Sequence, residues 1–546
     1  MGLGVLQDHS SLERVPGTVI LDEEYAHSEE ITANLKHGTG RSAHIVLVPQ
    51  PSDDPNDPLN WPYWKRLSIM AILVYGGCLF AAVVGPLLSS GQAIIAVEFG
   101  RTIADLTLLS GYQLLVAACS GPIISAFSRK YGKRPTFLMS TFFGLLGTII
   151  GSATDSYDGL LAARIIQGGS ICAYEAIVYS IIGDIFFVHE RGLQTSIVTF
   201  TMTAVSNLAG VVTGPIVDNL GWKYLFHILV ACSAFQLVLL FLFVPETTYH
   251  RDMQYNLDEI DADIPADQLS EKQDRSAVTI ESAPGRAAQP RKKSFWQELA
   301  VYTGSHSDEN FLQLVVAPIL CCLNLAAFWM VVVVGMVISF YVAVSYVAAQ
   351  IFSAPPYLLT AAGVGYVFLG PFIGGILGSI LLGFTNDPLI IWCTKRNGGI
   401  YEPEFRLIQA VLGLFCGAGL VGFGCITQNK DAPEAAAFMW GMQLFGTVFL
   451  VSPISSYVID SYREMSSEVF IASMVFKNFM FYAYSYFVNN WTAMQGPREV
   501  FCVFGGIAFG LALTTIVVYI FGKRYRSFWH RHNLLKMLHV QTHAEM

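Results

Sequence analysis

The sequence predicts an all-α membrane protein with twelve transmembrane helices in two six-helix halves. Three observations support this fold class: the composition, the number of long apolar runs, and the distribution of basic residues. Of the 546 residues, 53% are hydrophobic and only 13% are charged, and the mean hydropathy is +0.49. Soluble domains carry about 25% charged residues. Because so little charge cannot solvate a soluble surface, lipid must be the main solvent of this chain.

A helix that crosses a bilayer needs about 20 mostly apolar residues. Runs of this kind fall into two groups of six, separated by a polar gap between residues 245 and 323. The first six are expected at 67–90, 105–127, 136–153, 159–183, 194–216 and 223–244. The second six are expected at 324–350, 357–384, 406–427, 435–459, 467–488 and 501–521. The stretch from Phe311 to Cys322, which Pro318 interrupts, is expected as an interfacial lead-in to the seventh span.

The basic residues orient these spans, because Lys and Arg concentrate on the cytoplasmic side of a membrane. With both termini inside, nearly all of the 32 Lys and Arg fall in cytoplasmic segments. The exceptions in outer loops are Arg101, Lys223, Lys430 and Arg498. A glycosylation sequon at Asn490 is expected in the outer loop between spans eleven and twelve, which agrees with this orientation.

The predicted organisation has five parts. They are a cytoplasmic tail (1–65), an N-terminal bundle (66–245), a cytoplasmic linker (246–312), a C-terminal bundle (313–522) and a second tail (523–546). The first tail lacks hydrophobic periodicity and is expected to be flexible. The linker has too few apolar residues for a core, so we expect it to join two bundles that move against each other.

Several function classes lack their motifs in this sequence. The ten cysteines lie mostly in apolar runs without C-x-x-C spacing, which argues against a metal site. There is no H-E-x-x-H, G-x-S-x-G or P-loop motif, so neither an enzyme nor an ATP-driven pump is expected. We therefore expect no cofactor, with an ion gradient as the energy source. A signalling receptor is likewise poorly supported.

Ionisable side chains at bilayer depth are costly and by default mark a transport pathway. Arg164 and Glu175 are expected toward the outer and inner parts of span four, and Lys477 near the middle of span eleven. Regular α-helical geometry places Arg164 and Glu175 on one face, about 16 Å apart along the axis. Glu175 is the predicted proton carrier; the alternative is a structural carboxyl between helices. Lys477 is interpreted as a movable counter-charge to Glu175 or a substrate anchor, against a static pair.

Two neighbours of Lys477 complete the predicted pathway. Tyr484 lies seven residues further on, on the same helical face, and Asn478 borders Lys477. Together they offer polar contacts beside an aromatic surface.

The segment "GPIISAFSRKYGKRPTF" (121–137) places four cations and a glycine turn between spans two and three. Positive-inside anchoring alone would explain the charges. The layout also resembles the loop 2–3 motif of the major facilitator superfamily, G-x-x-x-D-[RK]-x-G-[RK]-[RK]. The matching residues are Lys130, Gly132, Lys133 and Arg134. Ser125 and Arg129 replace the usual Gly and Asp, and loss of the Asp affects the charge lock that this motif is thought to form.

Further segments resemble the same superfamily. Arg164, Gln167 and Gly168 match its R-x-x-q-G motif in span four. In span five, Gly210-x-x-x-Gly214-Pro215 resembles the G-x-x-x-G-P motif of proton-driven exporters, although Asp218 and Asn219 stand where a second glycine pair is usual. "LNWPYWKR", "GDIFFVHERG", "PETTYHR" and "KRNGGIYEPEFRL" are similar to fungal members of the drug:proton antiporter family. The resemblance covers residues 58–525.

The resemblance implies the twelve-helix major facilitator fold, with two pseudo-symmetric six-helix bundles and alternating access around a midplane cavity. Spans 1, 4, 7 and 10 would line the cavity, flanked by spans 2, 5, 8 and 11. It also implies a small organic substrate and protons as ligands, a monomer in the lipid bilayer and no nucleic-acid partner. The plasma membrane is the expected location, with the vacuolar membrane as the alternative.

Two functions remain open at this point. The first is a proton-driven exporter of amphipathic organic molecules, such as drugs or secondary metabolites. The second is a proton-coupled importer of small organic cations such as polyamines, because similar fungal sequences include such uptake systems. Glu175 would suit a cation and Lys477 would not, so the charges do not decide between them.

Overall fold

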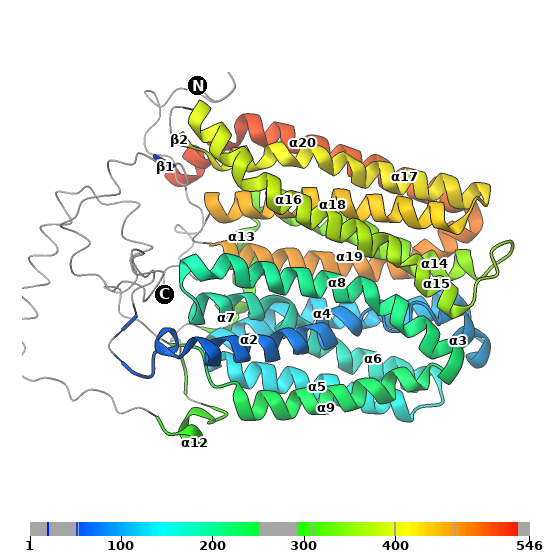
Figure 1. Ribbon diagram of the computed structural model, residues 1–546, viewed down its shortest axis with the longest axis horizontal. Coiled ribbons are helices and arrows are strands. Elements are labelled where there is room, and N and C mark those ends of the chain that lie inside the picture. Colours follow the sequence, from blue (N-terminus) through cyan, green and yellow to red (C-terminus); the bar gives the residue numbers. More distant parts are fainter. Residues whose placement is uncertain are drawn as a thin grey trace, which may run out of the picture.

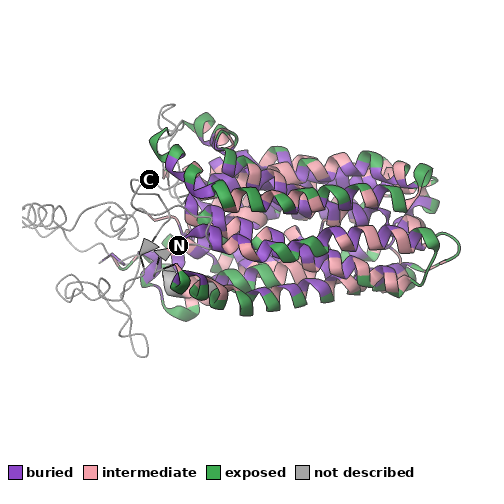
Figure 2. Ribbon diagram, turned by 90° about the horizontal axis from the view of Figure 1, so that it is seen from above, coloured by how far each residue is buried: buried purple, intermediate pink, exposed green. Residues whose placement is uncertain are grey.

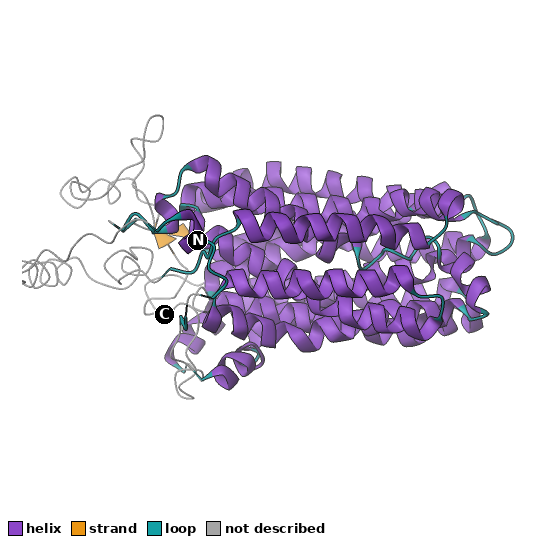
Figure 3. Ribbon diagram, turned by 90° about the horizontal axis from the view of Figure 1, so that it is seen from below, coloured by secondary structure: helices purple, strands orange, loops and turns teal. Residues whose placement is uncertain are grey.

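The computed structural model describes residues 19–20, 51–52, 54–249, 293–302, 304–306, 310–397, 400–462 and 465–532. Within them, long helices run side by side and form two bundles (Figure 1). Short loops connect the helices at both ends (Figure 3). Most of the predicted linker and of the two predicted tails lies outside the described residues.

The N-terminal bundle contains the first six spans. They are α2–η4 (Tyr63–Gly77, Cys78–Val83), α4 (Ile103–Tyr131), α5 (Lys133–Ala153), α6–η5–α7 (Tyr157–Cys172, Ala173–Ile177, Val178–Ile185), α8 (Val188–Leu220) and α9 (Lys223–Phe243). A short helix, η3 (Pro58–Asn60), precedes them, and α3 (Gln92–Phe99) lies in the first outer loop. The first span ends at Val83, earlier than the predicted residue 90, and a turn that contains Pro86 follows it.

The C-terminal bundle contains the other six. They are α14 (Leu325–Phe352), α15–α16 (Ala361–Val367, Leu369–Arg396), η7–α17 (Pro403–Gly413, Leu414–Asn429), α18 (Pro433–Ser461), α19 (Ser466–Gln495) and α20 (Pro497–Arg531). Two short helices precede them, α12 (Phe295–Glu298) and α13 (Phe311–Cys321). The helix α13 is the lead-in expected before the seventh span, and it packs against α4 and α19.

Eleven helical segments in the described part of the chain are long and apolar enough to cross a membrane. The predicted span outside this group is span eleven, α19, which has 30 residues and is long enough to cross a membrane. Its mean hydropathy is lowered by polar residues, among them Lys477, Asn478 and Asn489. Because α19 packs along α4 and α14 inside the assembly, neighbouring helices rather than lipid surround much of its polar face. The twelve-helix fold is confirmed.

Each bundle has its own apolar core. Phe80, Tyr174 and Phe226 are fully buried in the N-terminal bundle, and Phe340 and Trp440 in the C-terminal one. Exposed apolar side chains lie on the outer faces of the helices, where lipid would cover them (Figure 2). The two bundles meet where α4 packs against α19 and where α8 packs against α15 and α16. These are spans 2, 11, 5 and 8, the ones that the family resemblance places beside the cavity.

Two local features differ from the sequence expectation. The helix α20 continues to Arg531, so residues 523–531 of the predicted tail are helical. A buried charge cluster holds this extension, in which Lys523 and Arg526 pair with Glu402 and Glu404 at the start of the ninth span. A two-residue strand in the predicted flexible tail, β1 (Val19–Ile20), pairs antiparallel with β2 (Ile400–Tyr401).

Candidate transport pathway and its gates

Glu175 lies on a π-helical turn, η5, in the middle of the fourth span. A π turn is wider than an α turn and is frequent at functional sites. A second π turn, η4 of span one, packs beside it, where the rings of Phe80 and Tyr174 stack at 5.3 Å. The hydroxyl of Tyr174 is hydrogen-bonded to Thr141 at 2.6 Å. The residue next to Glu175 is therefore fixed in the bundle interior.

The π turn η5 lies between Arg164 and Glu175 only at its end, because the helix is regular α-helix as far as Cys172. The predicted common face of the two residues assumed 100° per residue throughout, and it stays a prediction. The two side chains have different partners: Arg164 contacts Val84, the residue that follows the first span, and Glu175 contacts Lys477 of the eleventh span.

Glu175 and Lys477 form an ion pair that joins the two bundles. Lys477 Nζ donates a hydrogen bond to Glu175 Oε1. Both side chains are largely buried: 15% of Lys477 and 24% of Glu175 is exposed. The ring of Phe481 lies 5.7 Å from the ammonium group. Glu175 Oε2 is buried and has no hydrogen-bond partner among the described residues. The structure thus brings together the two residues that the sequence singled out on separate spans.

Arg164 is fully buried near the outer end of the same span. Its Nη1 donates to the backbone oxygen of Val84 at 2.7 Å and to Gln167 Oε1 at 3.2 Å. Gln167 in turn donates to the hydroxyl of Thr148 at 3.0 Å. The R-x-x-q pair therefore acts as a unit that ties spans one, three and four together and holds one side of the guanidinium in place.

Asn478 and Tyr484, the other two residues of the predicted pathway on span eleven, are both buried. Asn478 is buried, and its Nδ2 has no partner in the described part of the chain. Tyr484 is buried among Phe340, Phe487 and Phe504, which belong to the C-terminal bundle. Its helical spacing from Lys477 is as predicted, but the aromatic cluster makes it a core residue rather than a neighbour of the Glu175 pair.

The loop between α4 and α5 consists of Gly132, whose φ of +102° favours glycine. The carboxylate of Glu246 accepts hydrogen bonds from the backbone N–H groups of Lys133 and Arg134, both at 3.0 Å, and so caps the start of α5. Lys133 also pairs with Asp184 of α7. These contacts hold the N-terminal bundle together at its inner end.

Lys130 contributes a backbone oxygen, which accepts a hydrogen bond from the backbone N–H of His306 at 2.8 Å.

Arg129 connects the same loop region to the other bundle. Its Nη1 donates to Glu468 Oε1 at 3.0 Å, and Glu468 is buried in the first turn of α19. Arg129 stands where the superfamily motif has an acid. The charge lock is therefore present with opposite polarity: the cation comes from the N-terminal bundle and the carboxylate from the C-terminal one. We call the Arg129–Glu468 pair the inner latch.

The outer ends of the bundles meet through the glycine motif of span five. A side chain at Gly214 would meet the backbone oxygen of Ala361 at 2.5 Å, and one at Gly210 would meet the ring of Phe368 at 2.8 Å. These glycines let α8 approach α15 closely. Pro215 lies within the same stretch of α8.

Asp218, one turn beyond Gly214, caps the facing helix. Its carboxylate accepts hydrogen bonds from the backbone N–H groups of Ala361 at 3.1 Å and Ala362 at 2.8 Å, at the start of α15. An acid at a helix N-terminus is favoured by both the free N–H groups and the helix dipole. We call this contact the outer latch. Asp218 replaces a glycine of the usual motif and supplies a contact between the bundles.

A sequence profile of the Major Facilitator Superfamily matches residues 67–484. The chain belongs to the major facilitator superfamily. It is therefore a multi-pass membrane transporter and not an enzyme.

Known proteins similar to this chain are also transporters. An uncharacterized MFS-type transporter of Schizosaccharomyces pombe, C1271.10c, is 24% identical over 98% of this chain and 96% of its own length. The MFS-type transporter hepF of Aspergillus oryzae is 25% identical over 81% of this chain and 86% of its own. Among solved structures, the partially occluded inward-open xylose transporter XylE from E. coli aligns with a TM-score of 0.53. It covers 82% of this chain and 98% of that one at 13% identity, which shows the shared fold.

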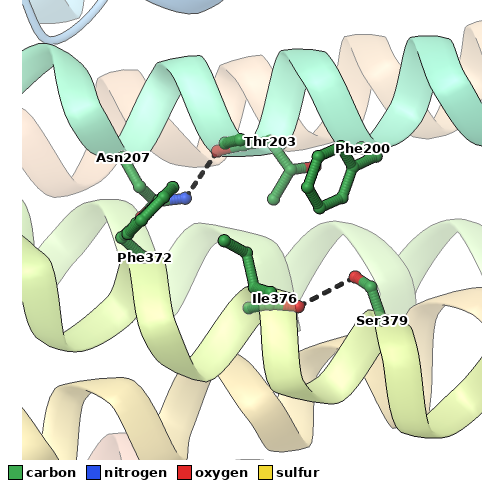
Figure 4. A pocket seen from close by; sticks show the side chains of 8 residues that line it. Phe200, Thr203, Asn207, Phe372, Ile376 and Ser379 are labelled. Carbon is green, nitrogen blue, oxygen red and sulfur yellow. Dashed lines mark hydrogen bonds between the residues drawn. The ribbon is translucent and has the colours of Figure 1, made fainter.

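A small cavity lies between the bundles, where α8 faces α16 (Figure 4). It has an empty volume of about 190 Å³, and Phe200, Phe372 and Ile376 give it an apolar lining. Polar groups come from Thr203, Asn207 and Ser379. Asn207 Oδ1 accepts a hydrogen bond from the hydroxyl of Tyr341 on α14 at 2.6 Å, a further contact across the bundle interface.

Asn490 does not lie in a loop, which corrects the sequence expectation. The helix α19 runs to Gln495 and α20 begins at Pro497, so the connection is Gly496 alone. Asn490 is exposed, but the sequon residue Thr492 is buried and donates to the backbone oxygen of Val488 at 2.8 Å. A sequon in a regular helix lacks the surface-loop setting that acceptor sites have.

Replacing Asp218 by alanine is expected to open the outer end of the interface. The change removes both hydrogen bonds to α15, so the backbone amides of Ala361 and Ala362 lose protection. Hydrogen–deuterium exchange of the peptide that covers α15 measures the effect, and we expect its amides to exchange roughly tenfold faster. Asn219→Ala is the matched control, because within the described residues the Asn219 side chain bonds to its own helix α8, at the oxygen of Pro215 at 2.8 Å. Equal exchange in the two variants would contradict the outer latch.

Proposed function

We propose that this transporter is a proton-coupled antiporter that exports amphipathic organic molecules, such as drugs or the organism's own secondary metabolites, by alternating access. The observation that carries the proposal is the Glu175–Lys477 ion pair, a partly buried carboxylate and ammonium contributed by different bundles. Alternating access requires the bundles to change their relative position. The pair must therefore loosen or break during the cycle.

Protonation supplies a way to break this pair. Separating a carboxylate from an ammonium group at bilayer depth leaves two charges without partners, which is costly. A proton on Glu175 neutralises the carboxylate and releases Lys477, so only one charge remains to be solvated. Proton binding and bundle movement would thereby be coupled through one residue pair, without any cofactor.

The surroundings favour an amphipathic substrate. Ligand sites of this kind are mostly apolar with a few placed polar groups. The cavity between α8 and α16 shows that mixture, with Phe200 and Phe372 beside Thr203 and Asn207. Its position at the edge of the seam suits molecules that partition into lipid.

The alternative, uptake of an organic polycation, is less favoured by the geometry. A polyamine would need a free carboxylate in the pathway, whereas Glu175 is already paired with Lys477. The ammonium group of Lys477 would also repel a cation at the same place.

The direction of transport tests this proposal. Cells that lack the protein should accumulate amphipathic compounds, tested with a panel of fluorescent dyes, and become more sensitive to toxic ones. Normal dye content together with a loss of labelled spermidine uptake would contradict export. We propose the plasma membrane as the location, with the vacuolar membrane as the alternative, and a tagged full-length chain distinguishes them by microscopy.

A further inference from the structure

Arg164 has an unused hydrogen-bonding edge. Its Nη1 donates hydrogen bonds to both Val84 and Gln167. Its Nε and Nη2 are buried and have no hydrogen-bond partner among the described residues. Nε and Nη2 form one side of the planar guanidinium. Their two parallel N–H groups match the two oxygens of a carboxylate, which is the geometry of bidentate recognition.

The charge of Arg164 is also uncompensated in the described part of the chain. Two other buried arginines there have acidic partners: Arg66 pairs with Glu190, and Arg526 with Glu402 and Glu404. A third, Arg134, donates to the backbone oxygens of Phe241, Val244 and Leu299, so its guanidinium is held by three carbonyls. For Arg164 the described residues supply a carbonyl, an amide oxygen and the ring of Phe226 at 5.9 Å, but no carboxylate. A buried charge without a counter-charge is strongly disfavoured, so an anionic ligand would be attracted to it.

The second bundle supplies a buried hydroxyl within electrostatic range of this guanidinium. Tyr346 of α14 is 5% exposed, and its hydroxyl has no partner among the described residues. The phenol lies near enough to interact electrostatically with the guanidinium of Arg164. The two groups come from spans four and seven, which belong to different bundles. A ligand between them would therefore touch both moving parts.

We propose that the Nε–Nη2 edge of Arg164 and the hydroxyl of Tyr346 bind a carboxylate of the transported molecule at the outer half of the seam between the bundles. This inference rests on the proposed export of organic molecules and names their class: organic acids with an apolar body. The guanidinium forms two hydrogen bonds to the carboxylate, and the phenol donates a third. The nearby Phe226 ring offers an apolar surface beside the anion.

Binding of 2-naphthoate to the purified full-length protein tests the site, with the uncharged 2-naphthamide as the matched ligand. Naphthoate should raise the melting temperature in a concentration-dependent manner, and naphthamide should not. Tyr346→Phe removes only the hydroxyl and should weaken naphthoate binding roughly tenfold. Arg164→Lys keeps the charge but loses the planar edge, and should weaken binding more than Tyr346→Phe does. Tyr357→Phe, in an outer loop, is the control that should leave binding unchanged.

The other outcomes overturn the proposal. Absence of stabilisation, equal stabilisation by naphthamide, or equal affinity in the wild type and both site variants would each contradict a carboxylate site. Full competition by sodium chloride or phosphate at equal concentration would assign the edge to an inorganic anion instead. The assay needs no proton gradient, so a failure of proton coupling is measured separately.

Discussion

Glu175→Gln is expected to reduce pH-driven transport to the level of protein-free liposomes, while the protein still inserts and folds. Glutamine keeps the shape of the side chain and one oxygen for Lys477, but it cannot take up a proton. The ion pair with Lys477 becomes a hydrogen bond to a neutral amide that no longer responds to pH. Flux of a fluorescent substrate into proteoliposomes with an imposed pH gradient measures the loss.

Asp155→Asn is the matched control for this prediction. It removes a carboxylate that is also paired with a lysine, Lys223, but Asp155 is 82% exposed at the outer end of the bundle. Flux should remain near the wild-type value. Normal gradient-driven flux in the Glu175 variant would remove Glu175 from the mechanism, and loss in both variants would indicate a general effect of the charge change.

Reversing the charge of Arg129 is expected to open the inner end of the transporter, and reversing Glu468 as well should close it again. Arg129→Glu places two carboxylates against each other where Glu468 is 1% exposed, and breaking a buried pair in this way costs about 3 to 5 kcal/mol. The double variant Arg129→Glu, Glu468→Arg restores the attraction. Recovery should be partial, because Glu468 lies in the first turn of α19, where the helix dipole favours an acid.

Labelling of a cysteine at Ala472, one turn further along α19 and buried, reports this opening. A water-soluble maleimide should label it roughly tenfold faster or more in Arg129→Glu, and slower again in the double variant. Lys395→Glu, an exposed charge reversal at the inner end of α16, should leave the rate unchanged. If the double variant labelled as fast as the single one, the inner latch would not be a direct charge pair.

Much of the fold was predictable because it depends on simple properties of the chain. Apolar run length and the position of basic residues identify spans without any tertiary information. Even α19, whose hydropathy is lowered by Lys477 and Asn489, contains a mostly apolar run of the required length at 467–488. The same reasoning chose Glu175 and Lys477 as pathway residues because each is an ionisable group at membrane depth.

The sequence could not show which of these residues meet. The π turn η5 packs against η4 through Phe80 and Tyr174, and no local sequence pattern predicts it. The partners Glu468 and Glu246 lie 339 and 112 residues along the chain from the loop residues they contact, so no local pattern could pair them. The departures at Arg129 and Asp218 were visible, but only the structure shows that each makes a contact between the bundles.

The central claim is that protonation of Glu175 releases Lys477 and lets the two bundles separate. The most direct test is the distance between spin labels at Ser68 of α2 and Lys395 of α16, both exposed at the inner end, measured as a function of pH. In the wild type, the distance distribution should change with pH along a single titration. In Glu175→Gln it should be the same at every pH, because the titrating group is gone. A pH-dependent shift in the variant equal to that of the wild type would contradict the account.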